Sequence, residues 1–319
     1  MMQEKIIEIL KAQLGYVSGE EISGQLKVSR QALWKHIQEL RESGYDIVAV
    51  PHLGYQLVQS PDRLFPQEVD CGLGTRFIGK RIHYQEKVSS TMDVALELGM
   101  QGLPEGTLVL TETQDKGRGR LGRSWSSPKY KGIYLSLILR PKISPLQSPI
   151  LTILCAVSLC EAIKKITQID SQIKWPNDIL IDNKKVAGIL TELNAEMDQV
   201  RFLVIGIGMN VNSDKKDLLS GATSLKEEKN ETINRIEMLQ EILRKIEANY
   251  LLFQENGKAK IIEKWREYNL TLGKRVKIIS HREHLEGQAV DIDSDGALLV
   301  RKDSGVVQKI TSGDVVHCR

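Results

Sequence analysis

The feature that most constrains this chain is a short tract of alternating glycines and arginines that ends in a tryptophan. It runs Gly117-Arg118-Gly119-Arg120-Leu121-Gly122-Arg123-Ser124-Trp125 and lies between two strand-like apolar runs. Glycine lets the backbone approach a ligand closely, and arginine presents planar, charge-assisted donors to phosphate or carboxylate oxygens. The tryptophan offers a flat face to a nucleobase. The tract therefore predicts a loop that closes over an anionic, nucleotide-like ligand.

Two other interpretations of the tract were weighed. Gly117, Gly119 and Gly122 satisfy the dinucleotide fingerprint G-x-G-x-x-G, and a strand-like run (107–113) precedes them. That fingerprint requires a helix to begin inside the motif and an acid about 20 residues further on. Serines and a proline follow instead, and 136–142 contains no acid, so a Rossmann site is excluded. A solvated basic loop stays open, although the flanking strands favour a ligand loop.

Composition limits the class of protein. The 319 residues leave room for two or three domains. Lys+Arg 44 against Asp+Glu 41 gives a net charge of only +3, so any DNA-binding surface must be local. The four cysteines form no C-x-x-C pair and no zinc pattern, which favours a reducing compartment. The N-terminus does not resemble a signal peptide, and the longest apolar run (150–159) is too short to span a bilayer. We expect a cytoplasmic protein without a membrane partner.

Residues 1–60 predict a winged helix-turn-helix domain that binds DNA. Apolar residues repeat at helical spacing in the first helix, Ser18 opens the second through an S-x-x-E capping box, and Ser29 caps the third. A hairpin at 45–58 supplies the wing, and the third helix is then placed for the major groove. A three-helix interaction module remains an alternative, because acids nearly balance bases here. The residues expected at DNA are Ser29, Arg30, Gln31 and Lys35.

The remainder predicts two more domains, which makes the chain an α+β multidomain protein. After a linker at 60–62, strands and helices alternate through 63–270, which indicates a mixed sheet with helices on one side. A hairpin turn is expected at 182–185. Residues 271–319 alternate like short strands, with turns at 293–296 and 303–305. This pattern is typical of a small SH3-like β-barrel.

Three further clusters in 63–270 carry polar groups that a plain core would not need. Ser89-Ser90-Thr91 lies at a helix start, where hydroxyls and free N–H groups can bind a polar ligand. Lys174-Trp175-Pro176-Asn177-Asp178 is a charged turn between two apolar strands. Gly206-Ile207-Gly208-Met209-Asn210-Val211 ends a strand with two glycines and an amide. Each alone is equally well explained as a helix cap, a β-turn or a tight strand end.

Together with the glycine/arginine tract, these clusters resemble the biotin protein ligases, and with the winged segment the chain resembles their bifunctional type, which also represses the biotin operon. The resemblance covers essentially the whole chain. Its motifs are G-R-G-R-x-G-R-x-W at 117–125, K-W-P-N-D at 174–178, K-x-A-G-I-L at 185–190 and G-I-G-x-N-V at 206–211. It implies a central domain of the biotin/lipoate ligase type.

The resemblance also implies a two-step reaction. In the first step the biotin carboxylate attacks the α-phosphate of ATP, which enters with Mg²⁺, to give biotinyl-5′-AMP and pyrophosphate. In the second step a lysine of the biotin carboxyl carrier protein of acetyl-CoA carboxylase, or of similar carboxylases, attacks this acyl-adenylate. No resident metal site is expected. Negative charge grows on the phosphate during the first step, and nearby cations would stabilise it. The expected catalytic residues are Arg118, Arg120, Lys185 and Asp178.

The family pattern further assigns the binding residues. Those expected at biotin are Ser90, Thr91, Met92, Gln114, Arg118, Gly119, Arg120 and Lys185. Those expected at the nucleotide are Arg120, Arg123, Trp125, Asn177, Lys185 and Asn210. Met92 stands where some relatives have Asn, which leaves only a backbone contact there. Ser126 stands where some have a second aromatic, so adenine stacking rests on Trp125.

The loop suggests regulation as well. A glycine-rich segment is costly to order without a ligand, so biotinyl-AMP is expected to order residues near 116–131 and to favour a homodimer. Two winged domains would then meet a two-fold operator. Two rival functions remain: a lipoate-type protein ligase, and a biotin-sensing transcription regulator without ligase activity.

Overall fold

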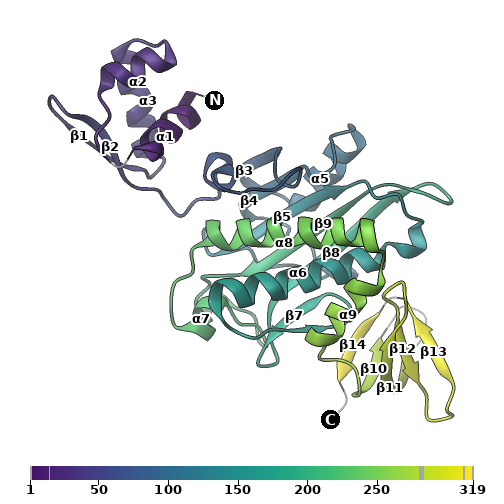
Figure 1. The fold of residues 1–319 in the computed structure, drawn as a ribbon. Coiled ribbons are helices and arrows are strands. Elements are labelled where there is room, and N and C mark those ends of the chain that lie inside the picture. The colour runs from purple at the N-terminus through teal and green to yellow at the C-terminus, as the bar shows by residue number, and fades with distance from the viewer. Residues whose placement is uncertain (1, 14, 280–283, 312, 318–319) are drawn as a thin grey trace. The chain divides into compact units, whose positions relative to one another are not determined.

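The computed structural model describes residues 2–13, 15–279, 284–311 and 313–317, and the chain divides into two compact units, Met1–Arg63 and Leu64–Arg319. Figure 1 draws both units as a ribbon, and each is described here by itself. Leu14, the last apolar residue in the helical repeat expected for the first helix, and the fourth cysteine, Cys318, lie outside the described residues.

The first unit has the predicted order of three helices and a hairpin. Its elements are α1 (Met2–Ala12), α2 (Gly19–Leu26), α3 (Arg30–Glu42), β1 (Asp46–Val50) and β2 (Gly54–Gln59). The Ser18 hydroxyl accepts the N–H of Glu21 at 3.0 Å, and the Ser29 hydroxyl accepts the N–H of Ala32 at 3.1 Å. Both helix starts predicted from capping serines are therefore confirmed. The core is apolar: Ile6, Ile7, Leu10, Val17, Ile22, Leu33, Ile37 and Leu40.

A seven-stranded mixed sheet organises the second unit, in the order β3-β4-β5-β9-β8-β7-β6. The strands are β3 (Ile82–Val88), β4 (Leu108–Gln114), β5 (Gly132–Leu139), β6 (Gln172–Lys174), β7 (Asp178–Ile181), β8 (Lys184–Ala195) and β9 (Val200–Asn210). Only the β3–β4 pair is parallel. The turn between β7 and β8 is shorter than expected: Asp182 and Asn183 have positive φ, and Lys184 already belongs to the strand.

Helices cover both faces of this sheet, so the expectation of helices on one side was wrong. The helices are α4 (Pro66–Asp70), α5 (Thr91–Met100), α6 (Pro149–Thr167), α7 (Leu225–Lys229), α8 (Arg235–Asn256) and α9 (Ala259–Tyr268). Helices α6, α8 and α9 contribute to the large core on one face (Figure 1). Helix α5 packs on the other face, where Met92 and Ala95 contact Val109, Ile138 and Val204. The continuous burial of β5 is typical of a strand that is covered twice.

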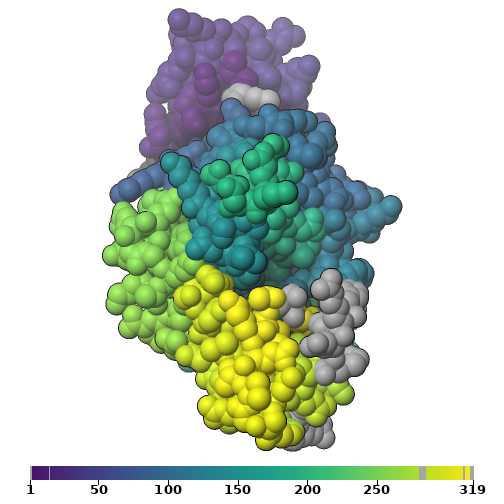
Figure 2. All heavy atoms as spheres, turned by 90° about the vertical axis from the view of Figure 1, so that its right-hand side faces the viewer, coloured from purple at the N-terminus to yellow at the C-terminus, as the bar shows by residue number. Residues whose placement is uncertain are grey.

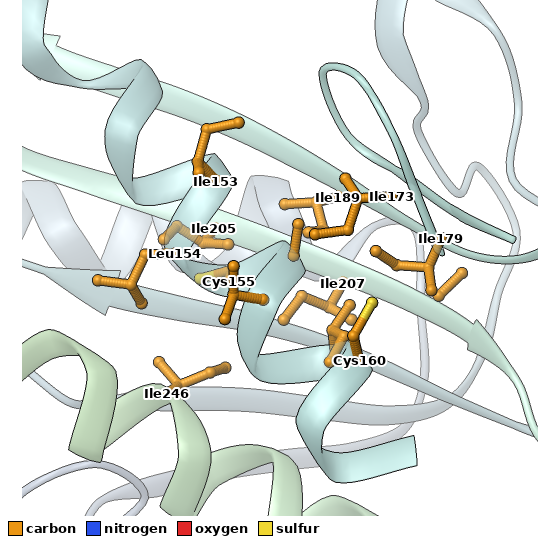
Figure 3. Packing of buried hydrophobic residues seen from close by; sticks show 14 of the residues in the cluster. Ile153, Leu154, Cys155, Cys160, Ile173, Ile179, Ile189, Ile205, Ile207 and Ile246 are labelled. Atoms are coloured by element: carbon orange, nitrogen blue, oxygen red, sulfur yellow. The ribbon is translucent and has the colours of Figure 1, made fainter. Parts of the chain in front are cut away.

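Helix α6 is the apolar centre of the large core. With the turn before it, this segment (145–167) is longer than the apolar run seen in the sequence and would by length and composition suffice to cross a membrane, yet most of it is buried within the unit. Its Cys155 and Cys160 lie among isoleucines of the sheet (Figure 3), and burial raises the pKa of both thiols to about 12. Both are free, which agrees with the expectation of incidental thiols.

The C-terminal strands form the predicted small β domain. The strands β10 (Arg275–Ile279), β11 (His284–Ile292), β12 (Leu298–Arg301), β13 (Val307–Ile310) and β14 (Asp314–His317) make an antiparallel sheet in the order β13-β12-β11-β10-β14. Its apolar residues join the large core, and the indole N–H of Trp175 donates to the carbonyl of Gly296 at 2.9 Å. In Figure 2 these strands, in yellow, lie against the rest of the second unit.

Candidate active site

A cavity of about 270 Å³ opens on the α5 side of the large sheet. The reason lies in β9: Val204 packs against α5, but two and four residues further on the same face come Gly206 and Gly208, which have no side chains. The predicted residues that line it, from all four motifs, are Thr91, Met92, Gln114, Arg118, Gly119, Arg120, Arg123, Trp125, Asn177, Asp178, Lys185 and Asn210. Residues more than 100 positions apart in the sequence therefore line the same cavity.

The floor of the cavity depends on glycines. Gly208 is the register partner of Gly188 in β8. A Cβ atom at Gly208 would lie 2.4 Å from Cε2 of Trp125, and one at Gly206 would lie 2.6 Å from the sulfur of Met92. Neither position accepts a larger residue without displacing its neighbour. The indole can lie flat on the sheet only because these strands carry glycine here.

One end of the cavity is a hydrogen-bonded clamp around Gln114. The Thr91 N–H donates to Gln114 Oε1 at 2.9 Å, the Thr91 hydroxyl donates to the same oxygen at 3.2 Å, and the Ser136 hydroxyl donates to Thr91 Oγ1 at 2.9 Å. Gln114 Nε2 donates to Ser127 Oγ at 3.0 Å, which ties β4 to the end of the tract. Thr91 and Ser136 are buried and Gln114 is half-buried, so breaking one of these contacts leaves a largely enclosed polar group unpaired.

Ser90 stands apart from the other predicted residues. It caps α5 but is fully buried and does not line the cavity. Among the described residues its hydroxyl has no hydrogen-bond partner. The hydroxyl that faces the cavity in this cluster belongs to Thr91.

Trp125 and the two asparagines form the opposite end. The Lys185 ammonium lies 5.4 Å from the centroid of the Trp125 ring. The Asn210 side-chain N–H donates to the carbonyl of Thr223 at 3.0 Å, and that of Asn177 donates to the carbonyl of Ile189 at 2.7 Å. The amide nitrogens thus secure the backbone around the cavity, and the oxygen of Asn177 accepts from Arg120.

Every predicted cation is paired with a carboxylate. Lys185 Nζ lies 2.6 Å from Asp178 Oδ1. Arg118 Nη2 lies 2.9 Å from Glu192 Oε2 and 3.3 Å from Asp93 Oδ1. These side chains are 27–52% exposed, so each pair contributes little to folding stability. An anionic ligand can therefore replace these carboxylates at small cost.

Arg120 lies deepest of the loop arginines. It donates from Nη1 to Asn177 Oδ1 at 3.1 Å and from Nη2 to the carbonyl of Gly313 at 3.2 Å. Burial lowers its pKa, while Asp314 and Asp178 oppose that shift. Arginine still keeps its charge at neutral pH. Arg123, more exposed, donates from Nη2 to Asp314 Oδ2.

A second loop was missed from the sequence. Residues 217–222 line the cavity together with the glycine/arginine tract. The Lys185 N–H donates to the carbonyl of Gly221 at 2.9 Å, and the Thr223 N–H donates to the carbonyl of Lys185 at 2.9 Å. The loop is thus attached to the strand that carries the lysine. Only Ser220-Gly221 marked it in the sequence, which is too weak a signal to identify a binding loop.

The predicted DNA-contacting residues share the exposed start of α3. Arg30, Gln31 and Lys35 are exposed, and Arg30 Nη2 lies 2.7 Å from Glu20 Oε2 of α2. The Ser29 hydroxyl serves as the N-cap described above. The buried side of α3 carries Leu33, Ile37 and Leu40. Helix α3 thus has an apolar face in the core of the first unit and a polar face exposed to solvent, as a recognition helix requires.

The second unit thus combines an apolar, amide-lined slot, an indole and several cations in the lining of one cavity. Such a cavity suits a ligand with a neutral polar head, a central anionic group and an aromatic base. Among the residues that the structure describes, no group of three or more His, Cys, Asp or Glu side chains could hold a metal ion.

Family comparisons agree with this division of the chain. Residues 84–210 match the Biotin/lipoate A/B protein ligase family, residues 2–56 match an HTH domain, and residues 271–318 match the Biotin protein ligase C terminal domain. The chain is similar to a Biotin protein ligase from Aquifex aeolicus in complex with biotin and ATP, with a TM-score of 0.65, 32% identity and coverage of 75% of this chain and 99% of that chain.

Relatives of similar length extend the match to the first unit. The Bifunctional ligase/repressor BirA of Bacillus subtilis (strain 168) is 41% identical over 98% of both chains. The protein of the same description in Escherichia coli (strain K12) is 29% identical over 98% of this chain and 95% of its own. With a shared fold, a shared order of motifs and nearly full coverage, the chain belongs to the family of bifunctional biotin ligase/repressor proteins.

Proposed function

We propose that this protein joins biotin to ATP in the cavity of the second unit, forms biotinyl-5′-AMP, and transfers biotin to a lysine of the biotin carboxyl carrier protein. The observation that carries the proposal is the convergence of four separated motifs on one cavity, whose lining includes the Gln114 clamp, the cations Lys185, Arg118 and Arg120, and Trp125. Biotinyl-AMP has groups to match each of these: a ureido ring, an acyl phosphate and an adenine.

The first step forms the mixed anhydride. Thr91 and Gln114 hold the ureido ring, and the biotin carboxylate oxygen attacks the α-phosphorus while the bond to pyrophosphate breaks. Lys185, Arg118 and Arg120 exchange their carboxylate partners for ligand oxygens and stabilise the growing negative charge. Mg²⁺ enters bound mainly by the phosphates of ATP, as is usual for this ion. Trp125 stacks on the adenine.

The second step transfers the acyl group. The neutral ε-amine of the carrier lysine attacks the biotinyl carbonyl, its nitrogen releases a proton to solvent as the amide forms, and the bond from the carbonyl carbon to the phosphate oxygen breaks. AMP then leaves with its negative charge held by the same cations. We assign Asp178 to guide the incoming amine, because its carboxylate faces the cavity next to Lys185. No covalent intermediate on this chain is needed.

Pyrophosphate release tests the reaction and separates it from its rivals. Purified protein with MgATP and biotin should release pyrophosphate, and adding the carrier protein should yield biotinylated carrier and AMP. Replacing biotin with lipoate should abolish both. Release with lipoate alone would favour a lipoate-type ligase, and release with neither acid would favour a biotin-sensing regulator.

The first unit supports a second role, repression of biotin genes. We infer that biotinyl-AMP orders residues near 116–131 and drives formation of a homodimer that places two winged domains on two-fold operator DNA in the cytoplasm. Sedimentation at micromolar protein should show a monomer that becomes a dimer when biotinyl-AMP is added. An unchanged mass would refute ligand-driven dimerisation. A salt-dependent gel shift on the chain's own upstream region tests the DNA contact separately.

A further inference from the structure

The first unit exposes a large aromatic side chain on α3. Trp34 is 56% exposed, whereas Trp175 and Trp265 are buried and Trp125 is half-buried in the cavity lining. Burying an indole is one of the largest apolar contributions that a side chain makes, and the core of the first unit does not use this one. A single apolar side chain on a surface is common, so its role has to be judged from its neighbours.

The neighbours of Trp34 make a positively charged helix face. Arg30, Gln31 and Lys35 are exposed as well, and helical spacing places all four side chains on one face of α3. The segment 30–38 contains no acid, because the glutamates of α3 come in its last turn. The ion pair between Arg30 and the acid of α2 is solvated, with side chains 72% and 81% exposed, and holds the cation weakly. An aromatic ring beside two cations favours a polyanion over a second copy of the same face.

Hydrogen bonds within the first unit hold the Trp34 ring. With the Gln38 amide in the orientation that satisfies both neighbours, its oxygen accepts from Trp34 Nε1 at 3.3 Å and from Arg41 Nη1 at 3.1 Å. Arg41 in turn donates from Nε to the carbonyl of Ile47 in β1 at 2.8 Å. An indole has one donor and no acceptor. The donor of Trp34 is therefore already used, and the exposed part of its ring offers only carbon to a ligand.

The chemistry of the exposed ring matches one feature of DNA. The major groove presents an apolar group, the 5-methyl group of thymine, and apolar side chains contact it. We propose that Trp34 is a specificity-determining residue of the first unit: its ring contacts a thymine methyl group in the operator, while Arg30 and Lys35 bind phosphates beside it. The inference rests on the proposed repressor role and deepens it, because phosphate contacts position a protein but do not read sequence. Binding then distinguishes thymine from uracil, which lacks only that methyl group.

Replacing thymine by uracil tests the methyl contact without changing base pairing. The full chain with biotinyl-AMP is titrated with a duplex from its own upstream region and with duplexes in which single thymines are replaced by uracil. At one position in each half-site, uracil should weaken wild-type binding about fourfold, the effect of one buried methyl group. Trp34→Ala should bind the thymine duplex about tenfold more weakly, because it loses the whole apolar contact, and should not respond to uracil at that position. Trp34→Phe, which keeps an apolar ring and has no donor, should retain the response.

A second exposed apolar residue of the same unit is the matched control. Val58 is 57% exposed but belongs to β2, so Val58→Ala should keep the full uracil response. Pyrophosphate release should stay at the wild-type rate in every variant, because the first unit does not carry the cavity. A uracil response of Trp34→Ala equal to that of wild type, no response in either protein, or a loss of dimer mass alone in Trp34→Ala would overturn the proposal. A wild type that shifts no upstream duplex in the presence of biotinyl-AMP would instead overturn the proposed repressor role.

Discussion

The two walls of the cavity are built by different forces. The sheet floor, with Gly206, Gly208 and the Gln114–Thr91 clamp, is held by the strand ladder and by buried hydrogen bonds. The glycine/arginine tract makes backbone hydrogen bonds within itself, such as that from the Gly119 N–H to the Arg123 carbonyl at 2.7 Å, and its Arg118 and Arg123 side chains form ion pairs with carboxylates from elsewhere in the unit. The floor therefore fixes the shape that a ligand must have, whereas the tract supplies charge that can exchange partners.

The energies of these contacts explain the difference. Leaving one buried polar group without its partner costs about 1–3 kcal/mol. A partly exposed ion pair is worth about 0–1 kcal/mol. Replacing Glu192 by a phosphate next to Arg118 therefore costs little, while moving Thr91 away from Gln114 costs much more. We expect changes in the floor to affect which acid binds, and changes in the cations to affect the rate.

The largest expected effect lies where the two walls meet, at Lys185, a floor residue that carries charge. Lys185→Gln should lower kcat for biotinyl-AMP formation by about 10²–10³-fold, because a preorganised cation is lost from the reacting phosphate. The check is single-turnover formation of biotinyl-AMP. Lys184→Gln is the neighbouring control: Lys184 pairs with Glu228 at 2.7 Å and does not line the cavity. Equal losses in both variants would contradict the assignment.

A larger side chain at a floor glycine is the most severe test of the floor. Gly208→Val should lower kcat/KM by about 100-fold, because a Cβ there would lie 2.4 Å from the Trp125 ring and must displace it. Steady-state kinetics with varied ATP measure the loss. Gly24→Ala, where an added Cβ meets nothing within 4 Å, should leave the kinetics unchanged. A fully active Gly208→Val would mean that the flat indole is not part of the nucleotide subsite.

Biotin selectivity is tested at the clamp. Gln114→Leu should raise the KM for biotin about tenfold and leave the KM for ATP nearly unchanged, because the Thr91 N–H and hydroxyl lose their acceptor. Gln101→Leu serves as the comparison, since Gln101 is exposed and contacts Glu97 at the end of α5. A rise in the KM for ATP alone would show that the clamp does not serve biotin binding.

The smallest expected effect comes from the other unit of the chain. Lys35→Ala should weaken operator binding a few-fold and reduce the slope of log affinity against log salt by about 1, as for one lost phosphate contact. Pyrophosphate release should stay at the wild-type rate. Binding titrations at several salt concentrations measure the slope, and an unchanged slope would remove Lys35 from the DNA contact.

Local features of the fold were predictable from the sequence. Ser18 and Ser29 marked helix starts because their hydroxyls satisfy N–H groups that a helix leaves unpaired. The four motifs marked the cavity because glycines and cations in those positions serve little purpose in a plain core. The second helical layer was missed, although the mainly apolar run of β5 (132–139), interrupted by Ser136, is the pattern of a strand covered on both faces.

Long-range partners were not predictable. Glu192, Asp93 and Asp314 are ordinary acids in the sequence, and nothing in their local pattern connects them to arginines that lie, for Arg123 and Asp314, 191 positions away. Ser90 shows a limit of the family pattern, which assigns this residue to biotin although the structure buries it outside the cavity lining. Pairings of this kind depend on how the sheet and the C-terminal domain fold together.

The account depends on one cavity in which fixed shape and exchangeable charge together activate biotin with ATP. The most direct test incubates the protein with biotin and α-labelled MgATP, without carrier protein, and isolates the bound product. We predict about one labelled biotinyl-AMP per chain, lost in Lys185→Gln and retained in Lys184→Gln. Label that appears in no biotinyl adduct, or only after carrier protein is added, would contradict the account.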